Sequence, residues 1–175
     1  VIDPDSGSIS LPDEVLFDVQ SARLTPSTQA FLKKFCGPWI ETVHAFGDRI
    51  KQMQIEGHSS SEWGALQGQA AYLQNLNLSQ QRSAAVVQFC LAQDLQPDVA
   101  AWARSVLVAV GLSSSRPVLL NGTEDSVRSR RVIFGFDIDK GKIIDDIKRS
   151  LDAERAEVLP PDGKPELPIG SDFGQ

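Results

Sequence analysis

Histidine, cysteine and long apolar segments are scarce in this sequence. The 175 residues include two histidines and two cysteines, and neither type is grouped at the spacing of a zinc or thiol redox motif. No apolar run approaches the roughly 20 residues of a membrane-spanning helix, and no basic-then-apolar leader opens the chain. We therefore expect no metal, no cofactor and no membrane span within this sequence.

Basic residues are also in the minority. There are 17 Lys and Arg residues against 23 Asp and Glu residues, giving a net charge of -6. Such a chain repels a phosphate backbone unless its bases are strongly clustered, so nucleic acid is not an expected partner. The 41% of apolar and 23% of charged residues are ordinary for one soluble folded domain. Cys36 and Cys90 lie in apolar stretches, which fits two buried thiols or one disulfide equally well.

Strand and helix patterns alternate along the chain. Predicted strands cover residues 14–21, 50–58, 105–111 and 130–138, where β-branched and aromatic residues gather or alternate with polar ones. Thr25 and Pro26 open a helix that Gly37 and Pro38 are expected to end or interrupt. Further helices are predicted near residue 79, at 97–104 and at 142–151, with long loops at 59–74 and 113–129. This order predicts an α/β fold: a two-layer sandwich of βαβαβ type, with a mixed sheet of about four strands and helices packed on it.

The patterns also suggest how the chain is divided. We expect a linker or edge segment over residues 1–13, one folded domain over 14–139, and an amphipathic helix over 140–157. Residues 158–175 are rich in proline and acidic side chains and lack a core-forming pattern, so we expect a disordered tail.

The segment "NLNLSQQR", residues 75–82, contains an electrostatic oddity. If a helix begins near Ser79, Arg82 lies in its first turn and on its apolar stripe, where a cation is unfavourable unless an anion meets it. The helix end and the guanidinium would together bind a carboxylate or phosphate, and Asn75 could orient that ligand through its amide. The alternative, which spacing alone favours, is an internal salt bridge from Arg82 to an Asp or Glu.

Two further segments are candidates for function. "GHSSSEW", residues 57–63, follows a predicted strand, where open α/β sheets commonly bind ligands. It lacks the GxSxG pattern of a nucleophile elbow, so a packed, hydrogen-bonded His58 is favoured over a hydrolase. Arg130 and Arg131 open the last strand and should point to opposite faces, so at most one joins a given site.

Taken in order, these segments resemble the OmpA-like peptidoglycan-binding domain shared by OmpA, Pal and MotB. The matching stretches are "VLFDVQSARLTP", "IEGHSS", "NLNLSQQRSAAVVQFCL", "VAVGLSSSRPV" and "SRRV". They correspond to the family's first strand, its GHTD turn, its NxxLSxxRA helix, its GxGxSxP strand end and its NRRV strand. The long loop and "YLQNLNLSQQR" are closer to stator-type subunits, such as MotB or a Zorya-like defence subunit.

The resemblance implies a non-enzymatic domain that holds the diaminopimelate residue of a peptidoglycan stem peptide. It implies that Arg82 binds a carboxylate, Asn75 the ligand backbone, and Arg130 forms a second basic contact. Leu78 would pack at the edge of the cleft, and Ser59 would offer its hydroxyl or backbone. The family aspartate that meets the ammonium group falls on Ser60, and Glu62 is our candidate substitute.

The function implied is anchoring of a membrane protein or complex to the cell wall. The resemblance implies a periplasmic location with a membrane anchor upstream of Val1, a homodimer, and an ion-channel membrane partner. The alternative is an OmpA-like fold kept as a protein-interaction or dimerisation scaffold with weakened wall binding, for which Ser60 is the main argument.

Overall fold

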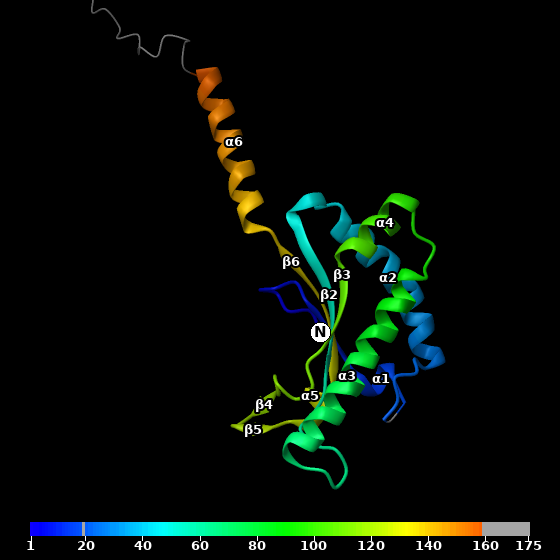
Figure 1. Ribbon diagram of the computed structural model, residues 1–175. Coiled ribbons are helices and arrows are strands. Elements are labelled where there is room, and N and C mark those ends of the chain that lie inside the picture. Colours follow the sequence, from blue (N-terminus) through cyan, green and yellow to red (C-terminus); the bar gives the residue numbers. More distant parts are fainter. Residues whose placement is uncertain (19, 159–175) are drawn as a thin grey trace, which may run out of the picture. The chain divides into compact units, whose positions relative to one another are not determined.

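The computed structural model describes residues 1–18 and 20–158 (Figure 1). Two compact units are distinguished: Val1–Ile138, and a second unit that starts at Asp139 and contains helix α6 (Lys140–Val158). The predicted amphipathic helix is thus present, with Ile144, Ile147 and Leu151 exposed along it. The predicted disordered tail, beyond Val158, lies outside the described residues.

A four-stranded mixed sheet forms the centre of the first unit. Its order is β1 (Ile9–Pro12), β6 (Arg131–Ile138), β2 (Ile50–His58) and β3 (Leu107–Gly111). Strands β2 and β3 run parallel, whereas β6 is antiparallel to both β1 and β2. The α/β class and the mixed four-stranded sheet are therefore confirmed.

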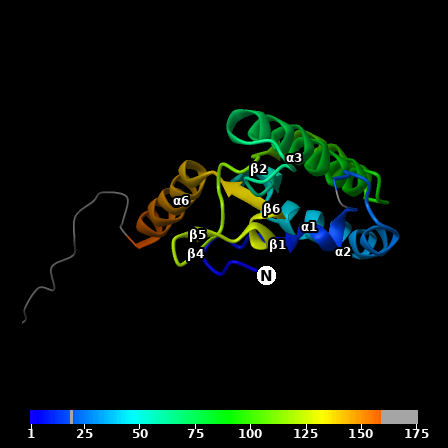
Figure 2. The same cartoon turned by 90° about the horizontal axis from the view of Figure 1, so that it is seen from below.

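Helices cover one face of this sheet. Helix α2 (Pro26–His44) and helix α3 (Gly68–Leu91) lie side by side there (Figure 2). Helix α4 (Pro97–Val106) leads into β3 (Figure 1). Their apolar residues meet the inward residues of the strands in one core that includes Leu32, Ile40, Met53, Ile55, Val86 and Phe134. Shorter elements complete the unit: α1 (Asp13–Leu16), η1 (Gly47–Arg49), β4 (Leu119–Leu120), β5 (Thr123–Glu124) and α5 (Ser126–Ser129).

The strand predicted over residues 14–21 is wrong. The edge strand is β1, and it is followed by the single turn of α1, which starts with Asp13 and Glu14 in its first turn. Acidic residues are stabilised there by the positive helix end. Among the described residues of this segment, Phe17 forms an isolated antiparallel bridge with Leu24. This turn matters because it brings a carboxylate to the site described below.

The predicted break at Gly37 and Pro38 is also wrong. Thr25 caps α2 by accepting a hydrogen bond from the Thr28 amide, and Pro26 follows as the first helical residue, both as expected. The helix then continues through Pro38 to His44. Ile40 and Val43 are almost fully buried beyond the proline, so tertiary packing outweighs the lost backbone hydrogen bond.

Helix α3 starts well before the predicted position. It begins at Gly68 rather than near Ser79, so the predicted loop 59–74 ends at residue 67. The helix buries a continuous stripe that is largely polar at its centre: Ala71, Asn75, Leu78, Ser79, Arg82, Ser83, Val86 and Cys90. A search for apolar periodicity recognises only the C-terminal half of such a stripe.

Two glycines let α3 approach the sheet closely. A Cβ atom on Gly57 would lie 2.3 Å from the Ser79 carbonyl oxygen, and one on Gly111 would lie 2.6 Å from the Gln80 nitrogen. Any side chain at either position would collide with the helix backbone. The ends of β2 and β3 therefore touch the middle of α3, which fixes its polar stripe beside the loop after β2.

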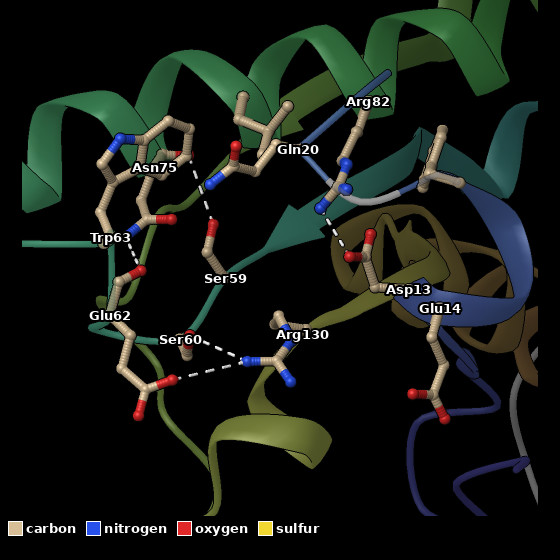
Figure 3. A pocket seen from close by; sticks show the side chains of 13 residues that line it. Asp13, Glu14, Gln20, Ser59, Ser60, Glu62, Trp63, Asn75, Arg82 and Arg130 are labelled. Carbon is tan, nitrogen blue, oxygen red and sulfur yellow. Dashed lines mark hydrogen bonds and ion pairs between the residues drawn. The ribbon is translucent and has the colours of Figure 1, made fainter. Parts of the chain in front are cut away.

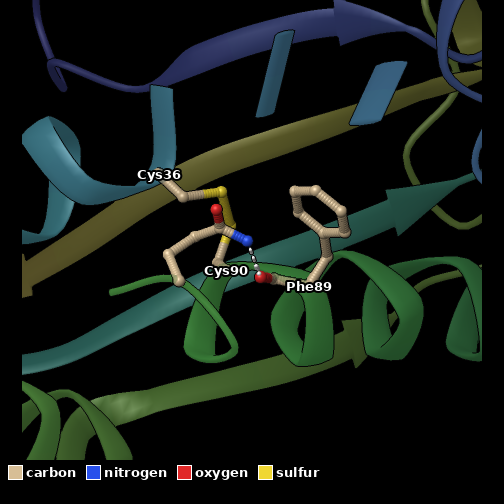
Figure 4. The surroundings of a disulfide bond; sticks show 4 residues. Cys36, Phe89 and Cys90 are labelled. Carbon is tan, nitrogen blue, oxygen red and sulfur yellow. Dashed lines mark hydrogen bonds between the residues drawn. A yellow bond between two sulfur atoms is a disulfide. The ribbon is translucent and has the colours of Figure 1, made fainter. Parts of the chain in front are cut away.

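Cys36 and Cys90 form a disulfide between α2 and α3 (Figure 4). Their Cα atoms lie 5.1 Å apart, and the bond joins positions separated by 54 residues in the sequence. Of the two alternatives compatible with the sequence, the structure thus has the disulfide. Among the described residues, no helix combines the length and apolar character needed to cross a membrane.

Candidate functional site

A pocket of about 330 Å³ opens between α1, the loop after β2, and the polar stripe of α3 (Figure 3). It is lined by Asp13, Glu14, Phe17, Gln20, Ser59, Ser60, Glu62, Trp63, Gly64, Asn75, Leu78, Arg82 and Arg130. All seven residues selected from the sequence, including Glu62, are in this set. The structure therefore brings the predicted site residues together, although they come from three separate parts of the chain.

Arg82 is not in the first turn of its helix. It lies in the middle of α3, so the interpretation as a helix-end anion site capped by Ser79 is wrong. The Ser79 hydroxyl instead donates to the Leu76 carbonyl and accepts a bond from the Ser113 amide. The buried cation Arg82 is met by an anion of the protein itself.

That anion is Asp13. Arg82 Nη1 donates to Asp13 Oδ2 at 2.5 Å, and the side chains are only 6% and 8% exposed (Figure 3). Arg82 also donates to the carbonyls of Ser21 and Asp18, at 2.8 and 3.3 Å. Its guanidinium carbon lies 4.9 Å from the centre of the Phe17 ring, a cation–π distance. The internal salt bridge therefore exists, and it ties α3 to the segment around α1.

Burial disfavours the ionised form of both Asp13 and Arg82. It raises the pKa of the Asp13 carboxyl, although Arg82 and Arg130 act in the opposite direction. It also lowers the pKa of Arg82, which Asp13 partly counteracts. Removing either partner would leave a buried charge uncompensated, which typically costs about 3–5 kcal/mol.

Asn75 and Ser59 hold the loop after β2 against α3. The side-chain amide of Asn75 donates to the backbone carbonyl of Glu62 at 3.1 Å. The Ser59 hydroxyl donates to the backbone carbonyl of Asn75 at 3.3 Å. Glu124 on β5 accepts hydrogen bonds from the Ser61 amide and hydroxyl and so ties the other side of the loop. The wall formed by this loop is therefore fixed by side chains that were not predicted to have that role.

Arg130 faces the pocket from the residue before β6. Its Nη1 donates to the Ser60 hydroxyl at 3.3 Å and lies 3.8 Å from Glu62 Oε2. The Arg130 side chain is 37% exposed and that of Glu62 is 68% exposed, so this ion pair is open to solvent. Arg131 does not line the pocket, and it donates to the carbonyls of Ser129 and Arg116. One arginine of the pair thus joins the site, as the alternation predicted.

His58 is buried and hydrogen-bonded, as the sequence indicated. Its Nε2 lies 2.9 Å from Glu56 Oε2, and this hydrogen bond is the largest of the causes that lower the pKa of Glu56. Neither residue lines the pocket. Within residues 1–18 and 20–158, no group of three His, Cys, Asp or Glu side chains is placed to hold a metal ion.

Several pocket residues were missed in the sequence. Asp13, Glu14, Phe17 and Gln20 were hidden because their segment was predicted as linker and strand, and Trp63 because it lies in a loop. The only available signal was "PDE" at residues 12–14, a proline and two acids typical of a helix start.

The pattern of the OmpA family matches residues 16–131, most of the first unit and all but Asp13 and Glu14 of the pocket. The chain belongs to the OmpA family. A second relationship is to the Zorya protein ZorB of Escherichia coli (strain ATCC 8739), which is 36% identical over 123 residues. That match covers 69% of this chain and 52% of ZorB, so the chain spans about half the length of this relative.

Solved structures share the fold of this chain. The periplasmic domain of Helicobacter pylori MotB (residues 97-256) matches with a TM-score of 0.56 at 16% identity, covering 87% of this chain and 96% of that one. The cell wall anchor of the T6SS from Pseudomonas aeruginosa matches with a TM-score of 0.52 at 23% identity, covering 75% and 81%. The OmpA-like arrangement of sheet and helices expected from the sequence is thereby confirmed.

Proposed function

We propose that this OmpA-family domain binds peptidoglycan non-covalently through the pocket, with the diaminopimelate end of a stem peptide as ligand. One observation carries the proposal: the pocket gathers the residues to which the sequence resemblance assigns ligand contacts, although they are far apart in sequence. The P. aeruginosa relative, described as a cell wall anchor, supports the same general function.

The pocket has suitable chemistry for such a ligand. A guanidinium has five N–H donors, and described residues accept three hydrogen bonds from Arg82. The remaining donors can bind a ligand carboxylate from a group that is already rigidly placed, so little side-chain entropy is lost on binding. Arg130 provides a second, more exposed cation for the same anion.

The other residues have secondary roles in this proposal. Asn75 offers its carboxamide oxygen to the ligand backbone, Leu78 packs against the aliphatic part of the ligand, and Ser59 and Ser60 offer hydroxyl groups. Glu62 is one of three pocket acids that could meet the ligand ammonium. The domain binds and does not catalyse.

The relatives suggest the setting of the domain. We infer that it is a periplasmic part of a membrane-anchored protein, because MotB is represented among the matched structures by its periplasmic domain and ZorB extends well beyond the match. A homodimer and an ion-channel membrane partner, as in stator-type subunits, complete the proposal. The disulfide fits an oxidising compartment such as the periplasm.

Co-sedimentation with purified sacculi that contain diaminopimelate tests wall binding. We expect the wild-type protein to pellet with sacculi, and Arg130→Ala to weaken the affinity about tenfold or more, as loss of a hydrogen bond to a charged group does. Arg82→Ala is a poor test by itself, because it also leaves Asp13 buried without its cation.

Arg104→Ala is the matched control, since Arg104 is an exposed arginine on α4 that does not line the pocket. It should pellet like the wild type. Equal binding by the Arg130 and Arg104 variants would contradict the proposed site. Failure of the wild type to bind sacculi would contradict wall anchoring and favour the interaction scaffold, which the internal Asp13–Arg82 pair and Ser60 also favour.

A further inference from the structure

The pocket contains three carboxylates, although the family acid is replaced by Ser60. Asp13 and Glu14 come from α1, and Glu62 comes from the loop after β2. A diaminopimelate end has an ammonium group beside its carboxylate, so one of these acids is expected to meet it. The three differ strongly in their surroundings, and this difference allows a choice between them.

Glu62 is the weakest of the structural candidates. Its side chain is 68% exposed and lies 3.8 Å from Arg130, and Glu14 is exposed as well. An ion pair in such solvent-exposed positions contributes about 0–1 kcal/mol. A carboxylate that is already shielded from water discriminates more strongly between charged and neutral partners.

Asp13 is such a carboxylate. Its side chain is 8% exposed, its Oδ2 accepts the hydrogen bond from Arg82, and its backbone amide donates to the Arg130 carbonyl at 3.1 Å. No second hydrogen bond to this carboxylate comes from the described residues. The group is therefore rigidly held at the pocket wall, directly beside the guanidinium proposed to bind the ligand carboxylate.

The charge of Asp13 is only partly offset by its neighbours. Burial raises the pKa of this carboxyl despite the nearby Arg82 and Arg130, so the anion is incompletely compensated in the unliganded protein. A ligand ammonium placed against it would supply the missing charge. A ligand with a carboxylate alone would instead add negative charge beside Asp13.

We propose that Asp13 is the acid that receives the ligand ammonium, so that Arg82 and Asp13 together recognise the zwitterionic end of an amino acid. This inference rests on the proposed function of the pocket. The acid then comes from α1 instead of the turn after β2. The pocket selects against a bare carboxylate because Asp13 repels it.

Titration with two small ligands tests this role. Meso-diaminopimelate and pimelate have the same seven-carbon dicarboxylate chain, and only the first has ammonium groups. By NMR or calorimetry, we expect the wild type to bind meso-diaminopimelate at least about tenfold more tightly than pimelate. Asp13→Asn should reduce this ratio to near one, whereas Glu62→Gln, which removes the same charge at the pocket mouth, should preserve it.

Two further measurements keep the test valid if Asp13→Asn does not fold. Asp13→Glu keeps the charge and should retain a preference for diaminopimelate. In the wild type, carboxyl NMR should show the pKa of Asp13 falling when meso-diaminopimelate is added and not falling with pimelate, with Arg82, Arg130 and Glu14 as the charged neighbours. No fall with diaminopimelate would overturn the assignment.

The outcomes separate this inference from the proposed function. If the wild type binds sacculi and prefers diaminopimelate, but folded Asp13→Asn keeps that preference or Glu62→Gln loses it, Asp13 is not the acid and wall binding stands. If the wild type binds neither sacculi nor diaminopimelate, the proposed function itself is wrong.

Discussion

Glu56 is a buried acid with a favourable set of neighbours. It is 8% exposed, accepts hydrogen bonds from His58 and Gln54, and lies 3.6 Å from Arg116. The hydrogen bond from His58 is the main reason that the pKa of Glu56 is lowered, with the charges of His58, Arg116 and Arg131 adding to it. Because the folded protein holds the Glu56 proton less tightly than the unfolded chain, ionised Glu56 stabilises the fold.

This pKa shift predicts a pH-dependent effect of Glu56→Gln. The stabilisation is present above the ordinary glutamate pKa of about 4.3 and is lost as the pH falls through the lower folded-state value. We expect Glu56→Gln to lower the free energy of unfolding by about 1–3 kcal/mol at pH 7, and by much less below the folded-state pKa. Urea denaturation over this pH range measures both values.

Glu41→Gln is a suitable control because Glu41 is exposed on α2. It should change the stability little at either pH. A Glu56→Gln penalty that is independent of pH would show that the glutamate contributes through packing alone.

Asp13 and Arg82 illustrate a different use of burial. Both charges are taken out of water, and their attraction compensates only part of that cost, as the opposite pKa shifts of the two groups indicate. Both residues also line the pocket. A residue pair that is costly to bury but lines a proposed ligand pocket is better explained by ligand recognition than by stability.

Among the elements, α3 has the strictest packing requirement. Its central turn lies directly on Gly57 of β2 and Gly111 of β3, with no space for a Cβ atom. The same turn carries Leu78 and Arg82 into the pocket. The position of the helix on the sheet and the geometry of the site are therefore set by the same two glycines.

Gly57→Ala should consequently affect both stability and binding. Because the methyl group would collide with the Ser79 carbonyl rather than with a flexible side chain, α3 must shift. We expect a loss of about 1–3 kcal/mol in the free energy of unfolding and weaker sacculus binding by the folded fraction. Chemical denaturation and co-sedimentation measure the two effects.

Gly135→Ala, in the adjacent strand β6, is the matched control. A Cβ atom there would have its nearest neighbour at 3.8 Å, an ordinary contact. Its effect should stay within about 0.5 kcal/mol. Similar losses from both substitutions would mean that the close approach of α3 is not the cause.

The helices also show where sequence patterns failed. Helix α2 continues past Pro38 because Ile40 and Val43 are buried against the sheet, and no local pattern contains that information. The first half of α3 went unrecognised because its buried face carries Asn75 and Ser79, polar residues that form hydrogen bonds to neighbouring loops. By contrast, β2, α4, β3 and β6 were predicted well, since each has a local pattern of apolar residues typical of its element.

In the molecule as a whole, the disulfide is the main covalent constraint. It joins α2 to α3 and closes a loop of 54 residues that includes β2 and part of the pocket wall. Closing such a loop restricts the unfolded chain, and the chain-entropy relation gives about 4 kcal/mol of stabilisation.

We therefore expect the double variant Cys36→Ala/Cys90→Ala to unfold with a free energy lower by roughly 2–4 kcal/mol. Thermal or urea denaturation with and without a reductant measures this. Reductant should destabilise the wild type and leave the double variant unchanged. A wild type that is insensitive to complete reduction would contradict a stabilising disulfide.

The sequence alone determined the α/β class, the mixed sheet, the strands β2, β3 and β6, and seven of the residues that line the pocket. These follow from apolar periodicity and from short motifs in a fixed order, both of which are local properties. The ion pair between Asp13 and Arg82 in the pocket could not be predicted in this way. Arg82 is separated from Asp13 by all of α2, all of β2 and the first half of α3, and the sequence shows only that it needs an anion.

Only the tertiary structure decided which anion that is and how the two cysteines are used. Both depend on distances between segments that are remote in the chain, which are set by the packing of α3 on Gly57 and Gly111 and of α1 against Arg82. The cost of a buried charge is partly offset when the fold brings its partner to 2.5 Å, because the interaction of two charges depends on their separation and burial rather than on their order in the sequence.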